Sequence, residues 1–374
     1  MGNDLLELLK EQLATHPAMQ LQDCIKLLYQ RILGSEHMAM PYECCYEMLC
    51  IEKEKIGTDT SLPAYDRIGD ISCRFHLLPI SGDSETLHTL SKLFFKSMEM
   101  LSANASGRMP VLEEALMLLL GWIQEGLLPF DAKEAEEFLA QYRAKGCPAI
   151  HHSDIYRATY HPAYRLLRTD YAHYFSLFAA IDRLLIQKKH VVIAIDGKCG
   201  AGKSTLANLL SEVYPCNLIH MDDFYLPADL RTEERLSEAG GNIHYERFAT
   251  QVLPALKALR IRDSQNASEP FISVPYQVFD CHHMDYHIEC PVITDKPLTI
   301  VEGSYSLRPE FRDAYDLKIF LDIPEKTQKE RLLARNGEEA YKNFESKWIP
   351  MELRYFEAFQ IKNHCDLTFS SDEK

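Results

Sequence analysis

The sequence lacks an excess of positive charge. It contains 40 Lys and Arg residues against 55 Asp and Glu residues, which gives a formal net charge of −15. Both halves of the chain are acidic. A protein that binds nucleic acid usually needs a basic face that neutralises the phosphate backbone. We therefore expect no nucleic-acid partner, and small-molecule chemistry fits the composition better.

Long apolar runs are also missing. The most apolar run, residues 111–123, contains Glu113 and Glu114 and is shorter than the roughly 20 residues that a membrane span needs. We expect it to form a core helix, and we expect no membrane partner. With 16 Gly, 18 Pro and 46% hydrophobic residues, the composition excludes the fibrous and disordered classes.

Cysteine is present but forms no recognisable pattern. The eleven cysteines are an odd number, are spread thinly, and follow no secretory signal. Cys44, Cys45 and Cys50 form a local cluster without C-x-x-C spacing, so buried structural thiols are favoured over metal ligands. The cysteine usage predicts a reducing, cytoplasmic location.

Residues 1–186 are predicted to form a mostly α-helical domain. Leucines between residues 5 and 13 share one helical face, and residues 21–33 repeat this pattern. Tyr156, Tyr160 and Tyr164 are four residues apart, and we expect such a stripe to pack in a core. A regulatory role, oligomer formation and a contribution to a substrate pocket are all open for this half, so a homo-oligomer is one candidate assembly.

Residues 187–374 show a different rhythm, in which short β-branched runs alternate with helical stretches. This alternation is typical of a parallel sheet with crossover helices. The expected strands are residues 191–195, 217–221, 298–301 and 317–321, with weaker candidates at 271–274 and 367–369. The expected helices are residues 203–213, 245–259, 325–334 and 340–359.

A phosphate-binding loop lies between the first of these strands and the first helix. The residues match G-x-x-x-x-G-K-[ST] in full, and Thr205 begins the apolar part of the helix. They are Gly197, Lys198, Cys199, Gly200, Ala201, Gly202, Lys203 and Ser204. Glycines let consecutive backbone N–H groups converge on phosphate oxygens, and the helix N-terminus adds partial positive charge. The fold class is therefore α/β, with a P-loop NTPase-type parallel sheet flanked by helices after the helical domain.

Two residues of the loop have predicted roles in catalysis with ATP and Mg²⁺. Lys203 is expected to reach the β- and γ-phosphates, and the Ser204 hydroxyl is expected to coordinate Mg²⁺. The metal would offset the charge that builds up on the transferring phosphoryl group.

Carboxylates follow two of the other strands. Asp222 and Asp223 stand at the end of the second strand, the edge where open parallel sheets bind ligands. A carboxylate there can accept the proton of an attacking hydroxyl, and we choose Asp222 as the base with Asp223 as the alternative. Glu302 ends the strand at 298–301, where P-loop proteins keep the acid that holds Mg²⁺ or its water.

Arg331 and Arg335 are four residues apart and share one face of a predicted helix. Two guanidinium groups placed in this way can fold over the phosphates and stabilise the equatorial oxygens. No Asn-Lys-x-Asp motif for reading guanine occurs in the sequence, which disfavours a GTPase.

Together, these motifs resemble the uridine kinase and phosphoribulokinase family over about residues 188–370. The resemblance implies ATP, Mg²⁺, an Asp base at Asp222 and a carboxylate at Glu302. The family also contains bacterial pantothenate kinase, so the resemblance implies phosphoryl transfer to a hydroxyl without fixing the acceptor.

Two stretches resemble the acceptor side of uridine kinases. One runs from residue 241 to 248 and the other from 275 to 282. The acceptor-binding residues that the resemblance implies are Tyr225, His244, Arg247, Phe279 and His282. His244 stands where the family has a ribose-binding Asp, and Gln277 stands where it has an aromatic residue. A ribose diol prefers a carboxylate that accepts two hydrogen bonds.

The leading hypothesis is an ATP-dependent kinase that phosphorylates a hydroxyl of a small molecule, a nucleoside or a related alcohol. An alternative from another class is an ATP-sensing interaction protein with little or no phosphoryl transfer. A third is a bifunctional enzyme whose first half has its own reaction.

Overall fold

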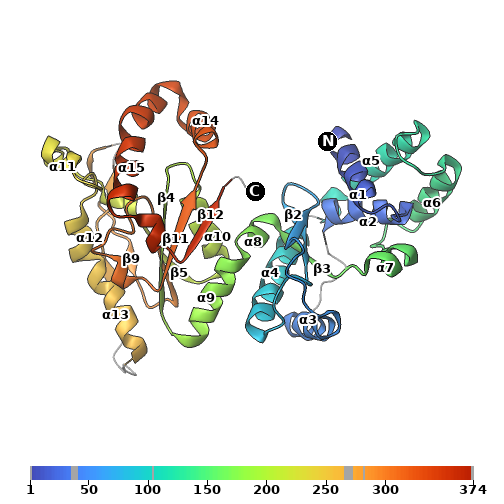
Figure 1. The fold of residues 1–374 in the computed structure, drawn as a ribbon, viewed down its shortest axis with the longest axis horizontal. Coiled ribbons are helices and arrows are strands. Elements are labelled where there is room, and N and C mark those ends of the chain that lie inside the picture. The colour runs from blue at the N-terminus through green and yellow to red at the C-terminus, as the bar shows by residue number, and fades with distance from the viewer. Residues whose placement is uncertain (1, 35–40, 103–104, 265–272, 281–282, 372–374) are drawn as a thin grey trace. The chain divides into compact units, whose positions relative to one another are not determined.

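The computed structural model describes residues 2–34, 41–102, 105–264, 273–280 and 283–371 (Figure 1). The chain divides into two compact units, Met1–Phe178 and Ala179–Lys374, which we call unit 1 and unit 2. The boundary predicted at residue 187 coincides with the last residue of helix α9 (Phe175–Gln187). A separately folding segment that ends at residue 186 stays a prediction.

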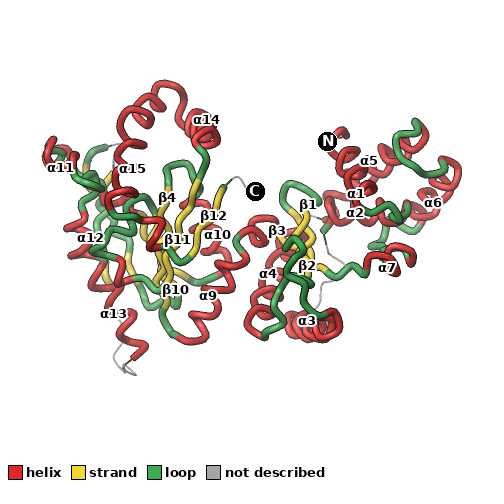
Figure 2. The backbone as a smooth tube through the Cα atoms, viewed as in Figure 1, coloured by secondary structure: helices red, strands yellow, loops and turns green. Residues whose placement is uncertain are grey.

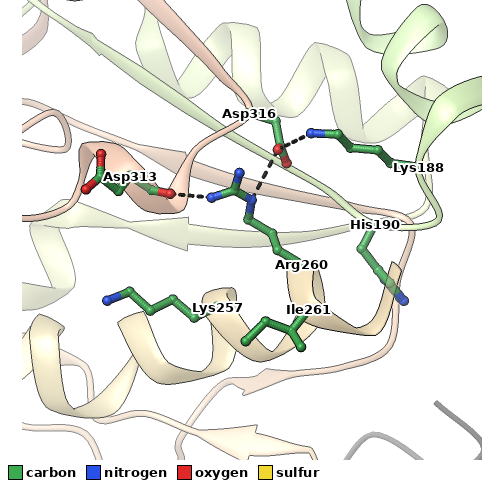
Figure 3. A pocket seen from close by; sticks show the side chains of 7 residues that line it. All are labelled: Lys188, His190, Lys257, Arg260, Ile261, Asp313 and Asp316. Atoms are coloured by element: carbon green, nitrogen blue, oxygen red, sulfur yellow. Dashed lines mark hydrogen bonds and ion pairs between the residues drawn. The ribbon is translucent and has the colours of Figure 1, made fainter. Parts of the chain in front are cut away.

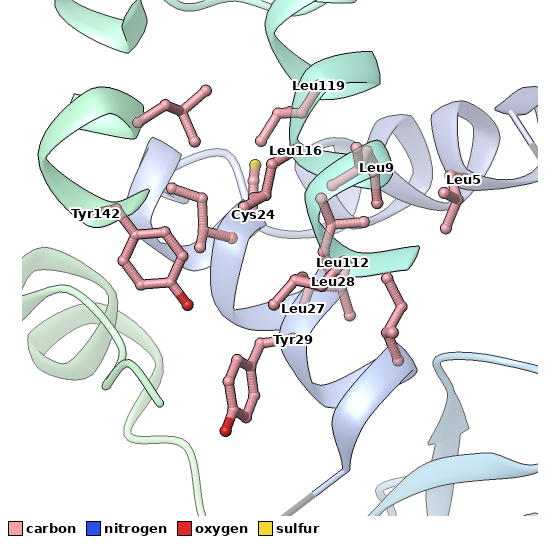
Figure 4. Packing of buried hydrophobic residues seen from close by; sticks show 14 of the residues in the cluster. Leu5, Leu9, Cys24, Leu27, Leu28, Tyr29, Leu112, Leu116, Leu119 and Tyr142 are labelled. Carbon is pink, nitrogen blue, oxygen red and sulfur yellow. The ribbon is translucent and has the colours of Figure 1, made fainter. Parts of the chain in front are cut away.

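Unit 1 is built mainly from helices, as its leucine spacing predicts. They are α1 (Gly2–Thr15), α2 (Leu21–Leu33), α3 (Tyr42–Ile56), α4 (Ser84–Ser102), α5 (Ala105–Gln124), α6 (Ala132–Ala144), α7 (Asp154–Tyr160) and α8 (Thr169–His173). Leucines of α1, α2 and α5 bury one another in its core, including Leu9, Leu28 and Leu116 (Figure 4). The apolar run at 111–123 lies in α5 and contributes to this core, as expected.

Unit 1 also contains a three-stranded antiparallel sheet that the sequence patterns did not predict. The strands β1 (Tyr65–Arg67), β2 (Ser72–His76) and β3 (Tyr164–Arg168) lie in that order. Ser72 pairs with Arg168, so the sheet joins segments almost 100 residues apart. Tyr156 is buried in the core of unit 1, and Tyr160 and Tyr164 pack against it, as expected, although α7 ends at Tyr160 and Tyr164 opens β3.

Unit 2 has the predicted fold class, a parallel five-stranded sheet flanked by helices (Figure 2). Its strands are β4 (Val191–Gly197), β5 (Cys216–His220), β10 (Leu298–Glu302), β11 (Leu317–Asp322) and β12 (Leu367–Ser370), in the order β12-β11-β4-β10-β5. Every residue of β4 and β10 is buried, as is usual where helices cover both faces of a parallel sheet. The four main strands and the weaker one at 367–369 are thereby confirmed.

The helices of unit 2 follow the sequence pattern in part. They are α10 (Lys203–Val213), α11 (Glu233–Ser237), α12 (Tyr245–Gln251), α13 (Leu253–Ser264), α14 (Glu325–Asn343) and α15 (Ile349–Ala358). The helix predicted at 245–259 is broken at Val252. The helix predicted at 340–359 begins inside α14 and passes through a π-helical turn, Phe344–Trp348, before α15.

Two short antiparallel strand pairs complete unit 2. Strand β6 (Val274–Pro275) pairs with β9 (Val292–Ile293), and β7 (Phe279–Asp280) pairs with β8 (Asp285–Tyr286). The weaker strand predicted at 271–274 falls partly outside the described residues, and Val274 lies in β6.

Two surface properties bear on the sequence predictions. Among the described residues, no helix is both long and apolar enough to cross a membrane. The expectation of buried thiols at the cysteine cluster is correct only for Cys45, since Cys44 is exposed and Cys50 is half-buried. Neighbouring residues on a helix point about 100° apart, so the three cysteines of α3 cannot all face the core.

Candidate functional site

The phosphate-binding loop connects β4 to α10 at the carboxyl edge of the sheet. Gly197 has φ +142°, and a Cβ there would lie 2.1 Å from the carbonyl oxygen of Leu321. Only glycine allows this close approach between the loop and β11. Gly202 has φ +97° and immediately precedes the first residue of α10, so the free N–H groups of the helix face the loop.

Lys203 lies over its own loop. Its Nζ donates to the carbonyl oxygens of Gly197 at 2.7 Å and Lys198 at 3.0 Å, and to Ser304 Oγ at 3.0 Å. All three acceptors are formally neutral. The ammonium charge therefore stays available to an anion that enters the loop.

Ser204 and Glu302 form the second part of the site. The Ser204 hydroxyl donates to Glu302 Oε1 at 2.9 Å, and Glu302 is 4% exposed at the end of β10. His220, at the end of β5, lies 2.6 Å from the same oxygen through its Nδ1. This hydrogen bond to Glu302 is the main reason that the pKa of His220 is raised, and burial opposes the shift.

Asp222 and Asp223 lie on the short 3₁₀ helix Met221–Phe224 that follows β5. Asp222 lines a cavity together with Lys203 and Glu302, and its side chain is accessible there. Removal of Asp222 from water by the surrounding protein raises its pKa, and the negative charge of Glu302 raises it further. Asp223 instead accepts a hydrogen bond from the hydroxyl of Tyr276, the residue after β6, at 3.3 Å.

Helix α14 lies over the loop. Gln328 donates to the carbonyl oxygen of Cys199 at 2.9 Å, and Arg331 donates to that of Gly200 at 3.2 Å. Arg335, one turn later, is exposed and also lines the cavity. The helix is interrupted at Gly337, where φ is +79° and ψ is 170°. Both predicted arginines therefore lie on the segment of α14 before this interruption.

Glu352 enters the site from α15. Its Oε2 accepts a hydrogen bond from the backbone N–H of Cys199 at 2.9 Å, and its Oε1 accepts one from Ser304 Oγ at 2.6 Å. Glu352 is only 6% exposed. One amide of the phosphate-binding loop is therefore paired with a carboxylate of the protein itself.

The buried Asp196 side chain stabilises the start of the phosphate-binding loop through hydrogen bonds. Its carboxylate accepts hydrogen bonds from the backbone N–H groups of Gly197 at 2.7 Å and Leu307 at 3.0 Å, and from the Tyr355 hydroxyl at 2.8 Å. Burial raises the pKa of Asp196 to about 6, although these donors oppose the shift. The carboxylate ties β4 to α15 and to the segment after β10.

These groups surround one cavity of about 470 Å³. The predicted residues that line it are Cys199, Gly200, Gly202, Lys203, Ser204, Thr205, Asp222, Tyr225, Glu302, Arg331 and Arg335. The volume is within the range of small-molecule sites. The structure thus brings the loop, both carboxylates and both arginines to one place.

The oxygen atoms at Ser204 and Glu302 fit Mg²⁺, which prefers hydroxyl, carboxylate and water ligands. Among the residues that the structure describes, no group of three or more His, Cys, Asp or Glu side chains could hold a metal ion. Mg²⁺ at this point would therefore need further oxygens from water or from bound phosphates, as is usual for this ion.

Solved structures similar to this chain include several kinases. A possible uridine kinase from Bacillus stearothermophilus is 20% identical, with 52% of this chain and 99% of that chain covered and a TM-score of 0.37. Phosphoribulokinase from Rhodobacter spheroides is 16% identical, with 49% and 70% covered and a TM-score of 0.32. A D-glycerate 3-kinase from Cryptococcus neoformans is 14% identical, with 50% and 88% covered and a TM-score of 0.32.

Each of these similarities covers about half of this chain. No family model matches the sequence, and no curated protein matches it. At these identities and TM-scores the similar structures do not bear on which acceptor the site takes.

The predicted acceptor-side residues do not all reach the cavity. Tyr225 lines it, but His244, Arg247 and Phe279 are not among its lining residues. His244 hydrogen-bonds to Glu246 at 3.1 Å and accepts from the N–H of Arg247 at the start of α12. His282 lies outside the described residues.

Arg247 and Phe279 instead pack in the buried region next to the segment that contains Asp223. Arg247 is buried, donates to the carbonyl oxygens of Asp223 and Gln277, and stacks over the ring of Phe224 at 4.4 Å. Phe279 is also buried. A role for these two residues in acceptor binding stays a prediction, and in this conformation they position the segment that carries Asp222 and Asp223.

A second cavity, of about 600 Å³, lies at the opposite, amino-terminal end of the strands. Lys188 Nζ and Arg260 Nε lie 2.6 and 3.1 Å from Asp316 Oδ1, and Asp316 Oδ2 also accepts from the N–H of Val192 (Figure 3). The buried Asp316 therefore compensates these two cations. This cavity is larger than the first but has no phosphate-binding loop.

Sequence reasoning missed three important side chains of the site. Ser304 could have been found, because it follows Glu302 at the same strand end. His220 could have been found in the same way, since it is the last residue of β5. Glu352 gives no local signal, because it lies 153 residues from its partner Cys199 and only the folded chain brings the two together.

Proposed function

We propose that unit 2 transfers the γ-phosphoryl group of ATP to a hydroxyl of a small molecule. The observation that carries this proposal is the convergence of Asp222 with Lys203 and the Ser204–Glu302 pair on one cavity. A nucleotide-binding site needs only the loop. A carboxylate that faces the place where the terminal phosphate would lie is what phosphoryl transfer to a hydroxyl adds.

Each group has a distinct task in this proposal. The loop amides and Lys203 bind the phosphate oxygens, and Arg331 and Arg335 offset charge from the side of α14. Mg²⁺, held by Ser204 and Glu302 together with the phosphates, would supply charge neutralisation. Glu302 also orients Ser204 by accepting its hydroxyl proton.

Asp222 is the general base of the proposed reaction. The acceptor oxygen forms a bond to the γ-phosphorus, the bond from that phosphorus to the oxygen it shares with the β-phosphate breaks, and ADP leaves with the bond's electrons. The hydroxyl proton passes to a carboxylate oxygen of Asp222. A raised pKa makes Asp222 a stronger base than an ordinary aspartate, which favours this transfer.

The acceptor is proposed to be an alcohol, with nucleosides among the candidates. Among the predicted acceptor-side residues that the structure describes, Tyr225 lines the cavity, and its ring offers an apolar surface with a polar end. His244 already interacts with Glu246 and with the start of α12. It would therefore hold a ribose diol less strongly than a free carboxylate would.

A screen for ADP release tests the proposal. Purified full-length protein with Mg·ATP would be offered nucleosides, sugars, and pantothenate-like and glycerate-like alcohols. We expect at least one alcohol to stimulate ADP release and to gain a phosphate by mass spectrometry. Lys203→Ala should remove this activity. No phosphorylated product from any of these classes, with ATP bound tightly, would contradict the proposal.

That negative result would instead favour a nucleotide-responsive protein with little transfer. One observation supports this second candidate function: the Glu352 carboxylate lies on the Cys199 amide of the loop. A protein that only senses ATP can tolerate such competition, whereas a fast kinase must displace the carboxylate in every cycle.

A further inference from the structure

We infer that unit 1 contains a binding site for the phosphate group of a small metabolite. The site is a cavity of about 350 Å³ between α2, the residues around α7, and β3. Its polar lining includes Lys26, Gln30, Glu52, Arg157, Tyr164 and Arg165. The volume is sufficient for a compact ligand. This inference does not depend on the kinase activity proposed for unit 2.

Lys26 is a buried ammonium group without a carboxylate partner. Its residue is only 8% exposed, and its Nζ donates to the carbonyl oxygen of Ile150 at 3.0 Å. Among the described residues, no carboxylate forms an ion pair with Lys26. An ammonium group has three N–H donors, and burying one without an opposite charge costs several kcal/mol. An anion in the cavity would compensate this charge.

The nearest candidates for a protein counter-ion are engaged elsewhere. Asp23, one turn before Lys26 on α2, accepts hydrogen bonds from Ser153 Oγ at 2.7 Å and lies 2.9 Å from His152 Nδ1. Glu52, which lines the cavity from α3, is paired with Arg165 at 2.7 Å. Neither carboxylate forms an ion pair with Lys26, although the charge of Asp23 acts on Lys26 from one turn away and opposes the fall in its pKa.

The lining as a whole is positive. Three cations, Lys26, Arg157 and Arg165, face one carboxylate, that of Glu52. Arg157 pairs with Asp154, but both side chains are largely exposed, and such pairs contribute little. With the buried carboxylate of Asp23 counted as well, an excess of one positive charge remains, which favours an anionic ligand such as a phosphate monoester.

A second buried cation adds to the positive potential behind the cavity. Arg74 on β2 is 3% exposed, and its guanidinium donates to the side-chain oxygens of Gln30 and Gln12, which are neutral. Its guanidinium also lies 5.1 Å from the ring centre of Tyr164. Burial, and next the charge of Arg74, lower the pKa of Lys26 to about 8. Lys26 is still mostly protonated at pH 7.

Thermal unfolding with methyl phosphate tests this inference. The full-length Lys203→Ala variant serves as the background, so that binding at the loop of unit 2 is weakened. At constant ionic strength, we expect methyl phosphate to raise the unfolding temperature saturably, by about 2 °C or more. Adding Lys26→Met should abolish the rise, and Lys26→Arg should keep it. Lys133→Met removes an exposed charge from the same unit and should also keep it.

The same experiment separates a ligand site from a merely structural lysine. Without ligand, Lys26→Met should unfold at a higher temperature than its parent, because it removes an unpaired buried charge. If Lys26→Met does not fold, Arg157→Gln at the exposed rim should weaken binding of methyl phosphate about threefold or more by calorimetry. An equal response to methyl phosphate with and without Lys26, no response in the parent, or an equal response to acetate would each overturn the inference.

Discussion

The Glu352 carboxylate accepts a hydrogen bond from the backbone N–H of Cys199 at 2.9 Å, inside the loop that would bind phosphate. A phosphate group and this carboxylate carry charge of the same sign, so they compete for the amide. We predict that Glu352→Gln binds Mg·ATP about tenfold more tightly, a difference of about 1.4 kcal/mol. Isothermal titration calorimetry measures this directly.

A matched control lies on the same helix. Glu357 is an exposed residue of α15, and Glu357→Gln removes the same charge without touching the loop. We expect its affinity for Mg·ATP to equal that of the parent. Unchanged or weaker binding in Glu352→Gln would show that the carboxylate does not compete with phosphate.

Asp222→Asn should separate nucleotide binding from transfer. The amide cannot accept the hydroxyl proton, and loss of a general base typically costs about 10²- to 10⁴-fold in rate. Binding of Mg·ATP should remain, because the loop and Ser204 are intact. Single-turnover assays with the best acceptor from the screen, together with calorimetry, measure both quantities. Asp223→Asn is the comparison, and a larger loss of rate in that variant would move the base to Asp223.

Strands and the loop could be predicted from the sequence because their signals are local. The β-branched runs at 191–195 and 298–301 are buried on both sides, so each is apolar throughout and each ends at a residue of the site. The phosphate-binding loop needs a fixed order of residues over one turn. In such cases the residues that the chemistry needs are neighbours in the sequence, so a local pattern is enough to find them.

Features that depend on distant pairs could not be predicted in this way. The sheet of unit 1 joins β2 to β3, and its short strands look like parts of helices or loops in isolation. Glu352 reaches the loop only because α15 packs there through the Tyr355–Asp196 hydrogen bond. The acceptor-side residues were inferred from a family resemblance, and of those that the structure describes, only Tyr225 lines the cavity.

Asp196→Asn should destabilise unit 2 by about 1 kcal/mol, because removal of a buried charge offsets part of the cost of a misplaced N–H donor. The fully buried carboxylate accepts hydrogen bonds from Gly197, Leu307 and Tyr355, and an amide would turn an N–H donor toward at least one of these donors. Urea unfolding at pH 7.5 measures the loss. The background is Trp122→Phe, so that Trp348, the second of two tryptophans, reports on unit 2.

The same variant should change the pH dependence of stability. Burial raises the pKa of Asp196 to about 6, above the value of about 3.9 in an unfolded chain. Between these values the folded protein keeps a proton that the unfolded chain has lost, so this group makes the unfolding free energy fall as pH rises. In Asp196→Asn, the unfolding free energy should therefore fall less steeply between about pH 4 and pH 6 than in the parent. An unchanged slope would show that burial does not raise the pKa of Asp196.

His220 should make unit 2 lose stability as pH rises above about 6.5, its pKa in an unfolded chain. The hydrogen bond to Glu302, and then the nearby carboxylates of Asp223 and Asp222, raise the pKa of His220 in the folded state. Its contribution is complete below the unfolded pKa and disappears as pH rises through the folded pKa. His220→Asn should therefore flatten the fall of unfolding free energy across this window, measured with urea in the Trp122→Phe background. His151→Asn, at an exposed histidine of unit 1, is the control and should leave that slope unchanged. If His220→Asn and its parent have equal slopes, Glu302 does not stabilise the protonated form of His220.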